Sequence, residues 1–169
     1  MGEEIINKVA QSKIFSFDME EYLPKSADIV RFDLADFLFQ GLVIKEMDFR
    51  SELKSLDWTK YENRSVLVLC STDAIVPIWA YMLVASYLSN ATAFYSNSEE
   101  DLYLSILRDT VQKLAEDNDF SGRPVIIKGC SNIPFKENLY LETTKLFLPL
   151  AKSILYGEPC STVPIFKKR

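Results

Sequence analysis

The feature that most constrains the fold is a short run, Ser65 to Leu69, that is apolar on both faces. Because successive residues of a strand point to opposite sides, both faces of this strand must be covered, as in a central strand of a parallel sheet between helices. An apolar helix is expected next, from about Pro77 to Leu88, with the proline tolerable only in the first helical turn. The run therefore predicts a strand-to-helix unit of an α/β protein.

The same alternation continues towards the end of the chain. The expected elements are a strand from Ala91 to Tyr95, a helix from the capping-box-like pair Ser98 and Asp101 to about Glu116, a strand from Val125 to Lys128, and a helix from Glu137 to Leu155 that Pro149 kinks or divides. Strands alternating with helices are typical of parallel sheets with right-handed crossovers. Ligand sites of such folds lie beyond the carboxyl ends of the strands.

The N-terminal part is expected to differ from this pattern. Ile14 to Met19 and Ile29 to Asp33 resemble short strands joined by a turn, which predicts an antiparallel edge pair. The stretch from Asp33 to Leu56 is helical in character but broken near Gly41. The expected fold is a single α/β domain over residues 1–169, with one mixed, mostly parallel sheet flanked by helices.

Length and charge limit the function classes. A chain of 169 residues suits one domain, and a net charge of −5 argues against nucleic acid as a partner, because phosphate binding needs clustered Lys and Arg. The residues from Met1 to Ala10 are acidic and amphipathic, unlike a secretory signal, so a cytoplasmic location is expected. The apolar run from Ala74 to Leu88 is too short to span a membrane. Nothing in the sequence indicates an oligomeric state.

Several catalytic chemistries are excluded by residue type. The chain has no histidine, which rules out serine triads, Cys-His dyads and zincin helices in their usual forms. With five glycines it has neither a dinucleotide fingerprint nor a Walker loop. Asp33, Asp36, Glu46 and Asp48 are interpreted as a solvated acidic face. Whether the protein is an enzyme stays open.

The three cysteines occur in the same short sequence pattern, in which Ser follows Cys and a proline comes a few residues later. Cys70 and Cys130 follow predicted strands, and the segment from Gly157 to Cys160 could fold back to add the third thiol. An odd number of widely spaced cysteines in a reducing compartment disfavours disulfides. We therefore expect Cys70, Cys130 and Cys160 to converge in one crevice.

Three thiolates are suitable ligands for zinc or for an iron-sulfur cluster. The remaining coordination position could be filled by Asp73, Glu158, water or a ligand from a partner. Two alternatives remain: a thiol enzyme that transfers sulfur or exchanges disulfides, and a non-catalytic interaction module whose cysteines are core residues. The compact Cys-x-x-Cys spacing of strong metal sites is missing.

Five segments resemble a family of small uncharacterised bacterial proteins, the domain of unknown function 2480 family. They are residues 32–42, 45–50, 70–81, 125–131 and 156–164, so the resemblance covers almost the whole chain. The family supplies no established activity. The resemblance does imply an association with iron-sulfur assembly genes, which favours a cluster over zinc and suggests iron-sulfur assembly proteins as partners. The leading hypothesis is an accessory factor that binds a metal or iron-sulfur cluster through the three cysteines.

Overall fold

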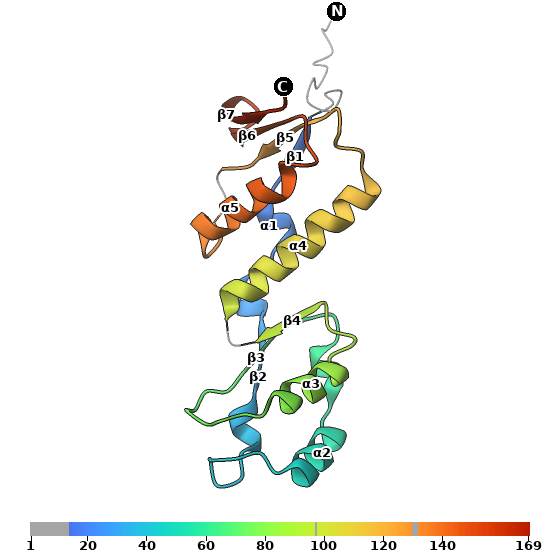
Figure 1. The fold of residues 1–169 in the computed structure, drawn as a ribbon, viewed down its shortest axis with the longest axis vertical. Helices are drawn as coiled ribbons and strands as arrows, with labels where there is room; N and C mark the ends of the chain where they lie inside the picture. The colour runs from blue at the N-terminus through green and yellow to red at the C-terminus, as the bar shows by residue number, and fades with distance from the viewer. Residues whose placement is uncertain (1–13, 97, 130–131) are drawn as a thin grey trace, which may run out of the picture. The chain divides into compact units, whose positions relative to one another are not determined.

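The computed structural model describes residues 14–96, 98–129 and 132–169, which form a mixed α/β structure with two sheets (Figure 1). The chain divides into two compact units. Unit 1 comprises Met1–Leu23 and Leu107–Arg169, and unit 2 comprises Pro24–Ile106, so unit 2 is inserted into the sequence of unit 1. The expectation of a single domain stays a prediction, because the grouping of contacts does not test whether the units fold separately.

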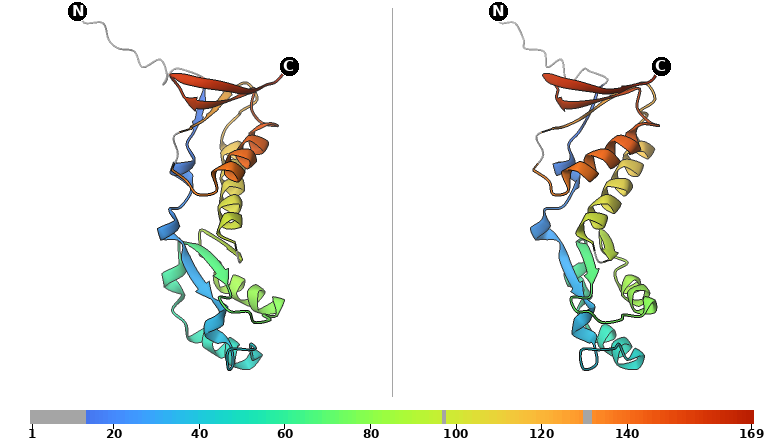
Figure 2. Two further views of the ribbon diagram at one scale, coloured as in Figure 1. Left: turned by 90° about the vertical axis from the view of Figure 1, so that its left-hand side faces the viewer. Right: turned by 60° about the vertical axis from the view of Figure 1, so that its left-hand side comes forward.

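Unit 1 contains sheet A, a four-stranded sheet in the order β1-β5-β6-β7. Its strands are β1 (Phe15–Phe17), β5 (Pro124–Ile127), β6 (Ser153–Glu158) and β7 (Ser161–Lys167), and its helices are α1 (Met19–Tyr22), α5 (Lys136–Phe147) and the C-terminal half of α4 (Glu99–Asp117). The first three strands are parallel, and β7 is antiparallel to β6. The views in Figure 2 show α5 beside α4, where Arg108 and Glu142 form an ion pair at 2.7 Å.

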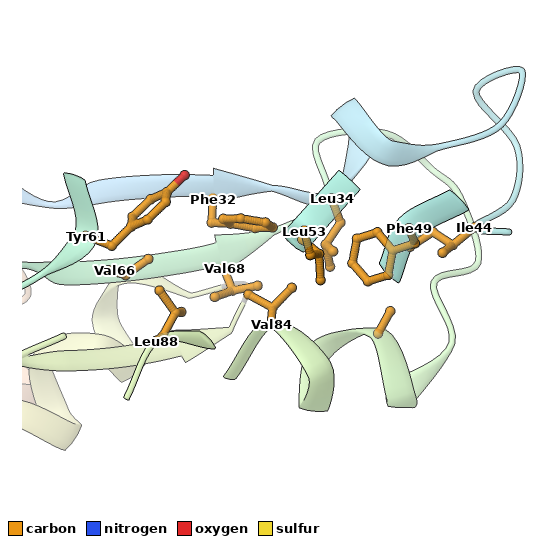
Figure 3. Close-up of a cluster of buried hydrophobic side chains, with 11 residues drawn as sticks. Phe32, Leu34, Ile44, Phe49, Leu53, Tyr61, Val66, Val68, Val84 and Leu88 are labelled. Atoms are coloured by element: carbon orange, nitrogen blue, oxygen red, sulfur yellow. The ribbon is translucent and has the colours of Figure 1, made fainter. Parts of the chain in front are cut away.

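Unit 2 contains sheet B, an all-parallel sheet in the order β2-β3-β4. Its strands are β2 (Val30–Asp33), β3 (Ser65–Leu69) and β4 (Ala93–Ser96), its α-helices are α2 (Glu46–Ser55) and α3 (Ile78–Tyr87), and its 3-10 helices are η1 (Ser26–Asp28), η2 (Leu34–Phe37) and η3 (Trp58–Tyr61). In Figure 3, Val66 and Val68 of β3 lie on the face of the strand towards α3, and Val84 of α3 points towards them. Phe32, Phe49 and Leu53 belong to the same buried core.

The first strand of each unit continues into the same short sequence. Residues 16–23 are SFDMEEYL and residues 31–38 are RFDLADFL. In each copy an aspartate, Asp18 or Asp33, accepts a hydrogen bond from the amide two residues later, at 3.0 and 2.9 Å. The preceding phenylalanine, Phe17 or Phe32, stacks on the ring five residues later, with centroids 5.1 and 5.3 Å apart. The two units therefore begin with one repeated motif.

The repetition extends to the central strand and its helix. Ile127 of β5 is the register partner of Phe17, as Val68 of β3 is of Phe32. Val68 and Ile127 differ in residue number by the same offset as each pair of equivalent buried residues from the α3 and α5 segments. Ala80, Val84 and Leu88 in unit 2 correspond to Leu139, Thr143 and Phe147 in unit 1. Each unit thus contains a strand, a loop with Cys-Ser in its sequence, a helix and a parallel returning strand.

The α/β class and the mostly parallel pairing are confirmed, but three expectations were wrong. There are two sheets, and the expected antiparallel N-terminal pair does not form, because β1 and β2 each pair in parallel with the central strand of a different sheet. The last helix does not run to Leu155: α5 ends at Phe147, and β6 begins at Ser153. Proline cannot continue a helix, and the apolar residues that follow it pair with β5.

Within the described ranges, no helix combines the length and the apolar character that crossing a membrane requires.

Candidate functional site

The predicted cysteine ligands belong to different units. Cys70 directly follows β3 in unit 2, is half-buried, and has its Sγ 3.4 Å from Thr72 Oγ1. Cys160 is exposed in the turn between β6 and β7 of unit 1. Cys130 belongs to the sequence of unit 1 but lies outside the described residues. Their convergence therefore stays a prediction.

The two proposed acidic ligands lie beside these cysteines in the sequence. Asp73 is exposed in the loop after β3, and Glu158 is the last residue of β6. In the part of the chain that the structure describes, no group of three or more cysteine or carboxylate side chains is placed to hold a metal ion. The zinc and iron-sulfur hypotheses gain no geometric support from these residues.

Asp33 fixes the start of the loop that contains Cys70. Its Oδ1 accepts hydrogen bonds from the amides of Ala35 at 2.9 Å and Ser71 at 3.0 Å. Burial pushes the pKa of Asp33 upwards, but the hydrogen bonds from the Ser71 side chain and from both amides outweigh it, so the pKa is lowered. Asp33 is therefore a structural anion, whereas Asp36, Glu46 and Asp48 are exposed as expected of a solvated face.

A pocket of about 620 Å³ lies in unit 1, at the carboxyl edge of sheet A. It is lined by residues from the end of β5 and the loop after it, from α5, and from strands β6 and β7, namely Ile127, Gly129, Lys136, Glu137, Tyr140, Leu141, Thr144, Tyr156 and Ile165. Its volume is in the usual range of small-molecule sites. The position agrees with the rule that ligands of α/β folds bind beyond the carboxyl ends of the strands.

Two tyrosines hold the floor of this pocket, which is the end of β5. Tyr140 of α5 donates its hydroxyl to the carbonyl of Lys128 at 2.7 Å, and Tyr156 of β6 donates to the carbonyl of Gly129 at 3.3 Å. Their rings meet edge to face, with centroids 5.6 Å apart. A Cβ at position 129 would lie 2.8 Å from the Tyr156 ring, so only glycine permits this approach. The aromatic wall therefore depends on glycine at the strand end.

An ion pair anchors the same strand end to β1 and α1. Lys128 Nζ lies 3.0 Å from Asp18 Oδ2, and this hydrogen bond, reinforced by the negative charge, raises the pKa of Lys128. Asp18 also accepts the amide of Glu20 at the start of α1. The carboxylate of Glu20 in turn accepts the amide of Asn132. Contacts of Lys128 and Asn132 therefore hold the chain before and after residues 130–131, which the structure does not describe.

The surface of the pocket is mostly apolar with a charged rim. Ile127, Leu141 and Ile165 supply aliphatic surface, while Lys136 and Glu137 stand in the first turn of α5. Thr144 turns its hydroxyl back to the carbonyl of Tyr140 at 2.8 Å, which leaves its methyl group as the feature a ligand would meet. This arrangement can accommodate an apolar body and places one cation and one carboxylate at the rim. Among the lining residues that the structure describes, no nucleophile contacts a base.

Sequence reasoning missed the pocket, although part of the signal was available. The expected helix from Glu137 to Leu155 hid β6, and without β6 and β7 the pocket has no outer wall. The tyrosines were not singled out, because their roles depend on register across the sheet. The recurrence of Phe-Asp-x-x-x-x-Leu after both N-terminal strands could have revealed the two units.

The model of a protein family of unknown function, DUF2480, matches residues 3–168 of the sequence. The chain belongs to the DUF2480 family. Searches among curated proteins and among solved structures found no significant match. The family resemblance seen in the sequence is thereby confirmed, while the site must be interpreted from its own geometry.

Proposed function

We propose that this DUF2480 protein is a binding protein that takes a small molecule with an apolar, ring-sized body into the pocket at the edge of sheet A. The observation that carries the proposal is the cavity of about 620 Å³, lined mainly by aliphatic and aromatic side chains at the carboxyl ends of two parallel strands. The hydroxyls of Tyr140 and Tyr156 hold the backbone at the floor. The rings themselves remain as contact surface for the ligand.

The rim favours a ligand that carries an anionic group. Lys136 lines the pocket, and among the described residues it forms no ion pair. It stands at the start of α5, where the backbone amides of a helix also favour negative charge. Lys128 is already neutralised by Asp18. The ligand class is therefore an aromatic or aliphatic ring system with one acidic substituent.

Fluorescence titration with 1-anilinonaphthalene-8-sulfonate, which has an apolar ring body and a sulfonate, tests this proposal. Leu141→Glu places a charge in the pocket from a side chain that is 69% exposed in the folded protein. Val163→Glu is the matched control, because Val163 is similarly exposed on β7 but does not line the pocket. We expect Leu141→Glu to weaken binding about tenfold or more and Val163→Glu to leave it nearly unchanged. Equal effects of the two variants would refute the proposal.

A second candidate is the thiol site, in which Cys70, Cys130 and Cys160 bind a metal or iron-sulfur cluster for an accessory role in cluster assembly. Support comes from the Cys-Ser pattern that the three cysteines share. In unit 1, two of the cysteines also lie close in sequence to residues that line the pocket. Gly129, which lines the pocket, directly precedes Cys130, and Tyr156, which contacts Gly129, comes four residues before Cys160. The same neighbourhood would suit the alternative of a thiol-dependent sulfur-transfer enzyme.

Metal and acid-labile sulfide analysis of protein purified without oxygen tests this second candidate beside Cys160→Ser. Iron with sulfide, or stoichiometric zinc, that is lost in the variant supports a cysteine-ligated centre. Metal that is retained in Cys160→Ser, or no metal after reconstitution, contradicts the three-cysteine site. Alkylation of a single cysteine at neutral pH would then indicate thiol chemistry, and unreactive thiols would indicate core cysteines.

A further inference from the structure

We propose that the free edge of β4 binds an extended segment of a partner protein, which adds to sheet B as β7 adds to sheet A. This inference is independent of the ligand proposed for unit 1. It starts from the repeat: β6 and β4 are the equivalent returning strands, since Ile127 pairs with Tyr156 as Val68 pairs with Ser96. The outer edge of β6 is covered by β7, whereas β4 is the last strand of its sheet.

The edge of β4 is short but lacks the charged residues, proline and bulges that usually protect an edge strand. Soluble proteins shield such edges with charged residues, proline or bulges, because unpaired backbone groups otherwise pair with other chains. The stretch from Ala74 to Ser98 contains no Asp, Glu, Lys or Arg. Phe94 and Tyr95 of β4 are nevertheless 40% and 41% exposed. An uncharged, aromatic, exposed edge is what a strand-binding site requires.

The backbone of β4 presents hydrogen-bonding groups to that edge. The amide of Thr92 bonds to the carbonyl of Arg64 at 2.9 Å, so Thr92 and Phe94 direct their backbone groups towards β3. In a strand the backbone groups of alternate residues point to opposite sides. The N–H and C=O groups of Ala93 and Tyr95 therefore face the free edge and are available to an added strand.

The helix behind β4 has an apolar face where the added strand would pack. By the offset that relates the two units, Ile78 and Met82 of α3 occupy the places of Glu137 and Leu141, which line the pocket closed by β7. Ile78 and Met82 are 74% and 68% exposed. A strand that directs an apolar side chain towards this helix face, as β7 directs Ile165 into the pocket, would cover them.

The size of the edge indicates a peptide segment and not a second copy of the chain. β4 spans four residues, and two such strands paired with each other would bury far less than the roughly 800 Å² per partner of a stable interface. Strand addition gains its affinity from main-chain hydrogen bonds and its specificity from pockets for alternate side chains. A flexible segment of another protein can supply both at an edge of this length.

Fluorescence anisotropy with a labelled peptide of residues 161–169, STVPIFKKR, added to the full-length protein tests the proposal, since β7 is the strand that fills the equivalent edge. Tyr95→Pro removes the outward N–H group at a position where an edge strand tolerates proline. Tyr95→Ser is the matched control, because it removes the ring and keeps the N–H group. We expect Tyr95→Pro to weaken peptide binding about tenfold or more and Tyr95→Ser to keep most of it.

Hydrogen exchange keeps the test decisive if a variant folds poorly. In the unmodified protein, the peptide should slow exchange of the Ala93 and Tyr95 amides. No protection there, or no peptide binding at all, overturns the proposal. Binding that is lost in Leu141→Glu and kept in Tyr95→Pro would place the peptide in the unit 1 pocket, which also overturns it. Self-association that Tyr95→Pro abolishes would identify a second copy as the occupant and would overturn the assignment to a partner protein.

Discussion

Unit 1 and unit 2 use the same motif, but only unit 1 closes it with a fourth strand. In unit 1, β7 covers β6 and supplies the Ile165 wall of a pocket. In unit 2 the equivalent strand β4 is an edge, and the helix face beside it, which includes Met82, stays exposed. The comparison shows that the presence of one additional strand distinguishes a pocket from an open sheet edge.

The two units have different residues after their equivalent central strands, β5 and β3. Packing at the end of each strand explains the difference. Gly129 lies against the ring of Tyr156 and has no space for a Cβ. The equivalent positions in unit 2 are Cys70 and Ser96, where a side chain follows the strand and no ring opposes it. Tyr140 has an equivalent in Tyr81. Together with β7, the residues at these two positions allow the strand end of unit 1 to form the floor of a pocket.

The largest expected effect tests whether the two copies have equivalent cores. Phe17→Ala and Phe32→Ala each remove a ring that is at most 2% exposed and stacked on an aromatic neighbour. Each should lower the free energy of unfolding by about 3–5 kcal/mol, measured by urea titration. Leu42→Ala, at a residue 66% exposed, is the control and should change little. A cost below about 1 kcal/mol at either phenylalanine would break the equivalence.

A smaller effect is expected where the copies differ. Gly129→Ala puts a Cβ 2.8 Å from the Tyr156 ring, so the ring or the strand must move. We expect a loss of about 1–3 kcal/mol in urea unfolding, together with weaker dye binding in the pocket. Gly122→Ala is the control, since nothing lies within 4 Å of a Cβ there. Should Gly129→Ala be as stable as that control, the close approach would have no energetic role.

The anchoring aspartate should give a pH-dependent effect. Asp33→Asn keeps a side-chain acceptor but removes the negative charge that strengthens the hydrogen bonds from Ala35 and Ser71, and should cost about 1 kcal/mol at pH 7. The folded protein holds the pKa of Asp33 below its ordinary value, so its contribution is present above that value and is lost as the pH falls through the lowered one. The difference between wild type and variant should therefore shrink on acidification below about pH 4. A difference that stays constant down to low pH would contradict this role, and Asp36→Asn serves as an exposed control.

The smallest effects compare the two hydroxyls at the pocket floor. Tyr140→Phe removes a part-buried hydrogen bond of 2.7 Å and should cost about 1 kcal/mol of stability. Tyr156→Phe removes an exposed bond of 3.3 Å and should cost less than about 0.5 kcal/mol. Thermal unfolding of both variants measures the order. The reverse order would show that β6, and not α5, holds the end of β5.

Much of the fold could be predicted from local sequence patterns. The run from Ser65 to Leu69 matches β3 in both bounds, and the predicted capping residue Ser98 accepts the amide of Asp101 at 3.1 Å. These features depend on a few neighbouring residues. The division into two sheets depends on which central strand pairs with each N-terminal strand. This pairing is non-local, so no local sequence pattern predicts it.

The candidate site was harder to predict for the same reason. Cys70 was placed correctly at the end of a strand, yet its unit differs from that of Cys160. The pocket forms only when α5, β6 and β7 are separate elements that lie side by side. The sequence predicts a single helix across α5 and the start of β6, so the pocket could not be predicted from it. Proline at position 149 was recognised as a helix break, but the pairing preference of the next residues was not.

The insertion of unit 2 between β1 and β5 also affects how the chain acquires its structure during synthesis. Unit 2 is contiguous, so all of its residues are available to one another once Ile106 has left the ribosome. Phe15 of β1, by contrast, pairs with Val125 and must wait until more than half of the chain has been made. Closing such a distant contact is slow, because a long loop has to lose its freedom first. We therefore expect the inserted unit to fold first, while the earliest-made strand waits for its partner.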